Sequence, residues 1–134
     1  MANMAEKANT KTTKQKAQNV PNGKVYVNAT FNNTLITVTD DVGNSIASGS
    51  SGRAGFKGTR KATPYAATTA VESAIKKAKD EFGVKSVDVF IKGPGPGRDA
   101  ALRAIKSLGL RMNMIADVTP MPYNGPRAKK KRRA

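Results

Sequence analysis

Apolar and polar residues alternate through the first third of the chain, and this pattern predicts three strands. Over residues 24–30, Val25 and Val27 alternate with polar or aromatic neighbours, which is the period of a strand with one buried face. Residues 34–39 form a β-branched run, and residues 45–48 form a shorter and weaker one. Since the links between these runs are short and rich in turn-forming residues, we expect a three-stranded meander.

A helical period follows over residues 64–82. Thr63 offers a side-chain oxygen for an N-cap, and Pro64 suits the first turn of a helix. Apolar residues then recur at spacings that place them on one helix face: Ala67, Val71, Ala74, Ile75, Ala78 and Phe82. Gly83 supplies the C-terminal stop.

The rest of the folded part is predicted as a strand, a helix and a strand. Residues 86–91 are almost continuously apolar, which favours a central strand of a sheet. A second helix opens near Arg98, after a turn of glycines and prolines, and ends at Gly109. Residues 111–118 form the last strand, and Pro120 stops it because proline cannot join a ladder.

This order of elements predicts an α/β fold with a mixed five-stranded sheet flanked by two main helices. A strand-helix-strand-helix-strand succession requires right-handed crossovers and some parallel pairing. We place the folded domain at residues 20–122, between a basic disordered extension over residues 1–19 and a basic disordered tail over residues 123–134. The extension lacks apolar periodicity, and the tail concentrates like charge, which extends a chain. This architecture alone defines no function.

The amino-acid composition excludes several classes of function. The 134 residues contain 24 Lys and Arg against 9 Asp and Glu, a net charge of +15, and neither His nor Cys. The lack of His and Cys excludes zinc fingers, thiol nucleophiles and His-based catalytic triads, and nothing indicates disulfides. No apolar run approaches a membrane span, and the polar N-terminus does not resemble a signal peptide. We expect a soluble, cytoplasmic protein without metal or cofactor, whose partner is a polyanion.

Positive charge concentrates at the C-terminus. Residues 1–19 carry a net +3, residues 20–122 carry +6, and residues 123–134 carry another +6 without any acidic residue. Lys and Arg on phosphates release counterions, and Tyr123 can stack on an unpaired base. Against a merely solvated tail, we favour nucleic-acid contact through Tyr123, Asn124, Arg127, Lys129, Lys130, Lys131, Arg132 and Arg133.

The Asn124–Gly125 pair suggests a chemical modification. Glycine does not shield the preceding side chain, so the next backbone nitrogen can attack the asparagine amide. We therefore hypothesise that Asn124 deamidates to isoaspartate.

A second basic segment, residues 49–61, interleaves glycines with cations. Glycines let a backbone approach a ligand closely, and Arg53, Lys57, Arg60 and Lys61 supply charge for phosphate oxygens. The segment also leads into a helix N-terminus, which favours anions. It matches neither the Walker nor the dinucleotide-binding glycine pattern. We favour contact with a phosphate backbone over a flexible surface connection.

The Gly-Pro-Gly-Pro-Gly segment from Gly93 to Gly97 allows two interpretations. Its prolines fix φ and remove two N–H groups, and its glycines allow tight passage of the chain. It could present Arg98 and a helix N-terminus to a phosphate, or it could be only a stiff corner between strand and helix. The sequence does not separate the two, so Arg98 is kept as a candidate RNA contact.

Catalysis finds little support in the sequence. A two-metal nuclease needs clustered carboxylates, whereas Asp88 and Asp117 are the only acidic residues in predicted strands. We expect neither an enzyme nor a small-molecule substrate. The alternatives are a metal-dependent phosphodiesterase or nuclease on this sheet, and a non-specific nucleoid protein that binds duplex DNA.

Several motifs, in order, resemble the family of the eleventh protein of the small ribosomal subunit, in its bacterial form. They are residues 28–34 (NATFNNT), 52–61 (GRAGFKGTRK), 63–67 (TPYAA), 92–95 (KGPG), 117–120 (DVTP) and 122–125 (PYNG). The likeness covers residues 22–127 and includes enough separate motifs to be highly specific.

The resemblance implies a ribonuclease-H-like fold without the nuclease carboxylates. It also implies binding of small-subunit ribosomal RNA in the platform, near the messenger RNA exit, with the sixth, seventh and eighteenth proteins of that subunit as neighbours and no membrane contact. The implied RNA contacts are Arg53, Lys57, Arg60, Lys61 and the tail from Tyr123 to Arg133. The family usually has His where Tyr123 stands and Cys where Pro126 stands, so only the charge role of the tail carries over.

Overall fold

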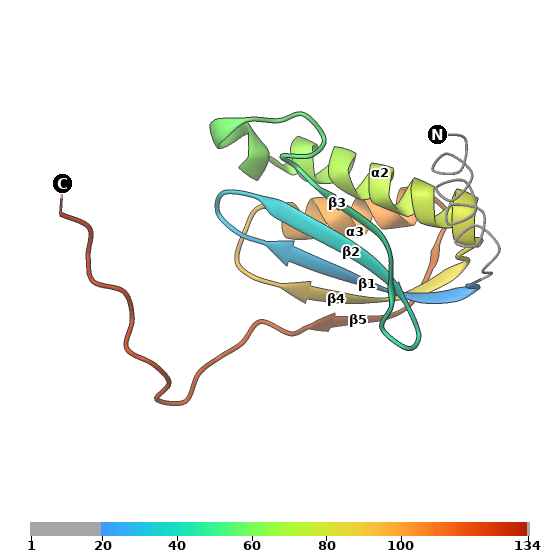
Figure 1. Ribbon diagram of the computed structural model, residues 1–134. Helices are drawn as coiled ribbons and strands as arrows, with labels where there is room; N and C mark the ends of the chain where they lie inside the picture. The colour runs from blue at the N-terminus through green and yellow to red at the C-terminus, as the bar shows by residue number, and fades with distance from the viewer. Residues whose placement is uncertain (1–19, 134) are drawn as a thin grey trace, which may run out of the picture.

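The alternating N-terminal segment forms the three predicted strands. The computed structural model describes residues 20–133 (Figure 1), so the extension predicted for residues 1–19 lies outside the described residues. Strand β1 spans Asn22–Ala29, β2 spans Thr34–Asp40 and β3 spans Ser45–Ser50. β1 pairs antiparallel with β2, and β2 pairs antiparallel with β3, which confirms the meander.

The predicted long helix is confirmed as α2, Pro64–Phe82. The Thr63 hydroxyl accepts a hydrogen bond from the Ala66 N–H at 3.3 Å, and Gly83 ends the helix in the left-handed conformation. The remaining predicted elements are β4 (Ser86–Lys92), α3 (Gly97–Ser107) and β5 (Arg111–Asp117). The sequence pattern does not predict η1, a 3-10 helix over Gly58–Ala62 within the expected loop.

The sheet is mixed, as the order of elements predicts. Its strand order is β3-β2-β1-β4-β5, with β4 parallel to both β1 and β5. The expectation that residues 86–91 form the central strand needs correction, because β1 lies at the centre and β4 lies between β1 and the edge strand β5. Burial alternates along β4 because its two faces have different surroundings.

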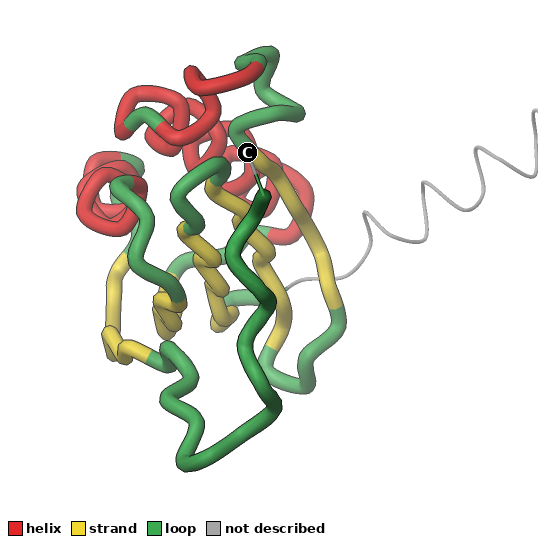
Figure 2. The backbone as a smooth tube through the Cα atoms, turned by 90° about the vertical axis from the view of Figure 1, so that its left-hand side faces the viewer, coloured by secondary structure: helices red, strands yellow, loops and turns green. Residues whose placement is uncertain are grey.

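Both main helices cover the same face of the sheet. α2 and α3 lie side by side over the strands in Figure 1, and Figure 2 shows the helices gathered on one side of them. The opposite face carries the stacked rings of Tyr26 and Phe90, whose centroids are 5.2 Å apart, and Tyr26 stays 40% exposed. The protein therefore has two layers with its core between them, and the sheet is flanked on one face only.

Small residues let the helix layer lie close to the sheet. The core between the layers includes Val25, Val27, Ile36, Val38, Val71, Ile75, Val89 and Ile105. At Gly49 in β3, a Cβ would lie 3.1 Å from the Ala70 carbonyl oxygen and 3.3 Å from the Ala74 Cβ, both on α2. β3 therefore rests directly on α2, which places the loop after β3 beside that helix.

The C-terminal ends of four strands lie at the same end of the sheet. β1, β3, β4 and β5 run in one direction, because β1 and β3 are both antiparallel to β2, while β4 and β5 follow β1. The basic loop follows β3, the Gly-Pro turn follows β4, and the tail follows β5. The topology thus brings all three candidate segments to one end of the sheet.

Residues 118–133, which follow β5, form no helix or strand. The last contact of their backbone with the sheet is the Val118 N–H, which donates to the Ile91 carbonyl at 2.8 Å. Residues 120–133 are exposed, and the tail runs away from the two layers (Figure 1). No helix within residues 20–133 is both long and apolar enough to span a membrane.

Candidate nucleic-acid interface

The basic loop between β3 and α2 is folded on itself. The Phe56 N–H donates to the Ser51 carbonyl at 3.3 Å, and η1 closes the loop before α2 begins. The stem of Lys61 passes Gly52, where a Cβ would lie 3.3 Å from the lysine Cδ. A small residue at Gly52 thus permits this close approach, and the loop holds its cations on a defined surface.

The loop cations have no acidic partners. Arg53, Lys57 and Arg60 are exposed, and Lys61 is half-buried. The single ion pair within residues 20–133 lies elsewhere, so none of the four is neutralised by a carboxylate there. Lys57 and Arg60 line a hollow of about 340 Å³ together with Phe56. The structure therefore brings Lys57 and Arg60 together at one hollow, whereas Arg53 lines another one and Lys61 lies beside Gly52.

Sequence reasoning overlooks two aromatic side chains beside these cations. The rings of Phe56 and Tyr65 meet edge to face, with centroids 5.8 Å apart and planes at 83°. Tyr65 is 73% exposed. Phe56 is half-buried, so Tyr65 is the ring that suits the stacking of an unpaired base. The signal in the sequence is that an aromatic residue stands on each side of the Lys57–Lys61 run.

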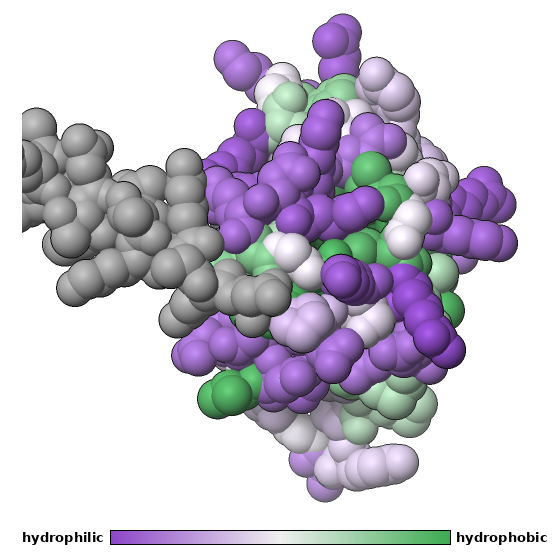
Figure 3. All heavy atoms as spheres, turned by 90° about the vertical axis from the view of Figure 1, so that its right-hand side faces the viewer, coloured by the Kyte–Doolittle hydropathy of each residue, from purple (hydrophilic) through white to green (hydrophobic). Residues whose placement is uncertain are grey.

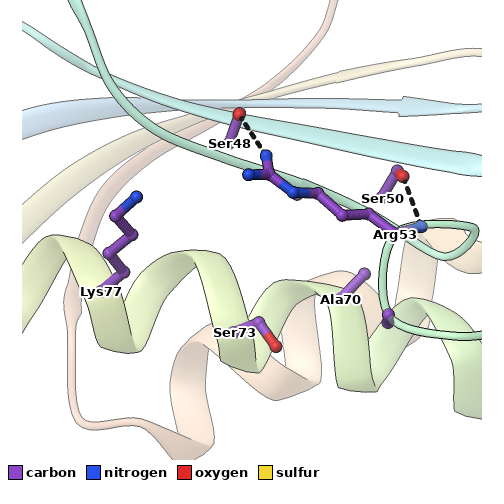
Figure 4. Close-up of a pocket in the computed structure, with 8 residues that line it drawn as sticks. Ser48, Ser50, Arg53, Ala70, Ser73 and Lys77 are labelled. Carbon is purple, nitrogen blue, oxygen red and sulfur yellow. Dashed lines mark hydrogen bonds between the residues drawn. The ribbon is translucent and has the colours of Figure 1, made fainter.

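Helix α2 adds a cation that the sequence does not single out. Arg53 and Lys77 line one hollow of about 250 Å³ between β3 and α2 (Figure 4). In the sequence, Lys77 is one of several lysines on the polar side of an amphipathic helix. Only the packing of β3 on α2 shows that it shares a hollow with Arg53.

The Gly-Pro turn is a tightly packed corner. Gly93, Gly95 and Gly97 are all buried, and a Cβ at each would collide with the chain where β1 leads into β2. The Gly95 N–H donates to the Ala29 carbonyl at 2.8 Å. These contacts support the structural interpretation of the segment, because its backbone faces protein rather than an open surface.

Arg98, a predicted RNA contact, is engaged within the protein. Its guanidinium donates to the Asp117 carboxylate at 2.7 Å and to the Gly93 carbonyl at 3.0 Å. Asp117 also accepts hydrogen bonds from the Thr119 hydroxyl and N–H, at 2.6 and 3.0 Å. The bonds from Thr119 and Arg98 lower the pKa of Asp117 to about 2. This cluster links Asp117 and Thr119, at the start of the tail (the root of the tail), to Arg98 of α3. RNA contact through Arg98 stays a prediction.

The carboxylate of Asp40 stabilises the turn between β2 and β3. Asp40 accepts hydrogen bonds from the backbone N–H groups of Val42, Gly43 and Asn44 in the β2–β3 turn. These bonds, that from Asn44 above all, lower the pKa of Asp40. Within residues 20–133, no group of three or more His, Cys, Asp or Glu is placed to hold a metal ion.

The tail presents its predicted residues to solvent. Tyr123 is 92% exposed, and all residues from Arg127 to Arg133 are exposed. Asn124 has a φ of 60°, a left-handed conformation that asparagine tolerates. In Figure 1 the loop lies above the sheet and the tail leaves below it, so the two segments start from the same end of the sheet but lie on opposite sides of it.

Hydropathy alone does not single out a binding end. The face seen in Figure 3, at the opposite end of the sheet, is also mostly hydrophilic. The loop of residues 49–62 and the tail of residues 118–134, in contrast, contain ten Lys or Arg and no acidic residue. Their common place at the carboxyl ends of the strands distinguishes this end of the molecule.

Fold and surface together define a class. A small α/β domain with acid-free cationic segments at one end of its sheet, one of them an extended tail, is typical of proteins that bind nucleic acid in ribonucleoprotein particles. The sequence model of one family, described as Ribosomal protein S11, matches residues 23–133 and so includes both the loop and most of the tail. Because the match covers well over half of the chain, the protein belongs to the ribosomal protein S11 family and is a protein of the small ribosomal subunit.

Proposed function

We propose that the chain binds small-subunit ribosomal RNA through the end of the sheet that carries the basic loop and the tail. The proposed place is the platform of the subunit near the messenger RNA exit, in the cytoplasm, with the sixth, seventh and eighteenth proteins as neighbours. There the protein supports subunit assembly and translation and carries out no reaction. The observation that carries this proposal is that two acid-free cationic segments both start from one end of the sheet.

The mechanism is neutralisation of phosphates. Each Lys or Arg that meets a phosphate releases a counterion, so log affinity falls with log salt by about 0.9 per phosphate on a duplex and about 0.7 on a single strand. The six cations of the tail then contribute a slope of about −4 to −5. Tyr65 and Tyr123, both largely exposed, supply rings for stacking on unpaired bases.

The two segments have different parts in binding. The loop is held by hydrogen bonds and by its packing beside α2, so it binds RNA with little loss of entropy. The tail has no such support and becomes ordered only between RNA helices, which costs entropy but lets it follow a narrow path. The α/β body positions the loop and the root of the tail relative to each other.

Competition binding tests the proposal. The full chain is titrated with small-subunit ribosomal RNA, and with duplex DNA of equal length, at several salt concentrations, and its co-sedimentation with small subunits is followed in moderate salt. We expect stable co-sedimentation and preference for the ribosomal RNA, because a folded RNA site fits the arrangement of loop and tail whereas a uniform duplex does not.

Two other outcomes of these experiments would favour the alternative functions, a nucleoid protein or a nuclease. Equal affinity for duplex DNA would favour a non-specific nucleoid protein and overturn the proposal. Magnesium-dependent cleavage of the RNA that disappears in Asp88→Asn or Asp117→Asn would favour a nuclease instead.

A further inference from the structure

We propose that the hollow between β3 and α2 binds one phosphate group of the RNA backbone, held by Arg53 and Lys77. This inference rests on the RNA binding proposed above and adds a specific site to it. The hollow measures about 250 Å³ and is lined by Ser48, Gly49, Ser50, Arg53, Ala54, Ala70, Ser73 and Lys77. The two charged residues among these are both cations, and no carboxylate of the described part of the chain lines the hollow.

The two cations reach the hollow from different elements. The Arg53 guanidinium donates to the Ser48 hydroxyl at 3.3 Å, which holds it along β3 rather than out in solvent (Figure 4). Lys77 extends from α2 into the same gap (Figure 4). It shares one helix face with Ala70 and Ser73, which precede it by seven and four positions. The packing of β3 on α2 at Gly49 fixes the width of the gap.

Two hydroxyl groups of β3 complete the site. The Ser48 oxygen accepts from the Arg53 guanidinium, and the Ser50 oxygen accepts from the Arg53 N–H at 3.0 Å. A hydroxyl that accepts a hydrogen bond still has its own proton to donate. The hollow therefore combines a guanidinium, an ammonium and two hydroxyl donors without a competing carboxylate. This set suits the oxygens of a phosphate and repels cations.

The surroundings indicate a nucleic-acid phosphate. Within residues 20–133, neither Arg53 nor Lys77 has an ion-pair partner, so two like charges face the hollow until an anion enters. The hollow adjoins the one lined by Lys57 and Arg60, since Ala54 lines both. A backbone that passes along the loop thus meets a series of cations, and of the two hollows the one at β3 and α2 is the one lined by serine hydroxyls.

Charge removal at α2 tests the site. In RNA titrations of the full chain, Lys77→Gln should make the salt slope shallower by about 0.7–0.9 and weaken binding at low salt about threefold to tenfold. Lys77→Arg keeps the charge and should bind as the wild type does. Lys76→Gln is the matched control, because Lys76 is the adjacent exposed lysine of α2 and does not line the hollow. Circular dichroism confirms that each variant is folded.

Inorganic phosphate is the second probe. A titration of the full chain followed by amide chemical shifts should move the signals of residues 48–53 in the wild type and not in Lys77→Gln. The proposal is overturned if these signals do not move, or if Lys77→Gln and Lys76→Gln have the same RNA salt slope. Wild-type chain that binds no ribosomal RNA overturns the proposed function as well, whereas normal RNA binding with an unaffected Lys77→Gln overturns this inference alone.

Discussion

Replacement of Gly93 by alanine tests whether the turn after β4 is a packed corner or an RNA-binding loop. Gly93 has a φ of 98°, and a Cβ there would collide with the Ala29 carbonyl oxygen at the end of β1. Gly43 has a φ of 112° and nothing within 4 Å of its Cβ position, so Gly43→Ala is a matched control. Backbone strain costs about 1–3 kcal/mol at either site. The collision adds about 1–3 kcal/mol at Gly93 alone.

Urea denaturation of the full chain measures the difference. We expect the free energy of unfolding of Gly93→Ala to lie about 1–3 kcal/mol below that of Gly43→Ala, with similar m-values. In a thermal scan, each kcal/mol corresponds to a decrease of about 4 °C in Tm. RNA affinity should not change under conditions in which Gly93→Ala is fully folded, because the corner faces protein. Equal stability of the two variants would refute the packed corner, and lost RNA affinity in a folded variant would support phosphate presentation.

Two further predictions concern the root of the tail and the tail itself. Thr119 and Arg98 lower the pKa of Asp117 from 3.8 to about 2, so the stability that this cluster contributes is complete above about pH 3.8 and is lost as the pH falls through 2. An NMR titration of the Asp117 carboxyl should therefore have its midpoint near 2, and a higher midpoint in Arg98→Ala, where the two bonds from Thr119 still lower the pKa; a wild-type midpoint near 3.8 would contradict the cluster. Asn124, exposed before Gly125, should convert to isoaspartate in aged native protein and not in Asn124→Gln, and peptide mapping that finds only asparagine would disprove this.

The elements that depend on local pattern could be predicted from the sequence. Val25 and Val27 alternate with exposed or half-buried neighbours in β1, as the sequence suggests, because one face of the sheet meets the core. The ends of α2 follow from Thr63 and Gly83, since capping depends on the residues at the helix ends themselves. The acid-free composition of the loop and tail likewise needs no tertiary information.

Features that depend on packing could not be predicted. The apolar run of β4 does not reveal that both helices lie on one face, because helix placement depends on the whole topology. Lys77 joins Arg53 only through the contact of β3 with α2. The pairing of Arg98 with Asp117 depends on the parallel alignment of β4 and β5, which carries Asp117 to the turn before α3. The sequence contains no local signal for such contacts.

The salt dependence of RNA binding by a tail-truncated chain tests the central claim most directly. The truncated protein lacks residues 123–134 and hence six cations, and a full-length variant with these six changed to glutamine separates charge from chain length. If the tail neutralises phosphates, both proteins should have a slope of log affinity against log salt that is shallower than the wild-type slope by about 4–5. A slope that stays at the wild-type value in both would contradict phosphate neutralisation by the tail.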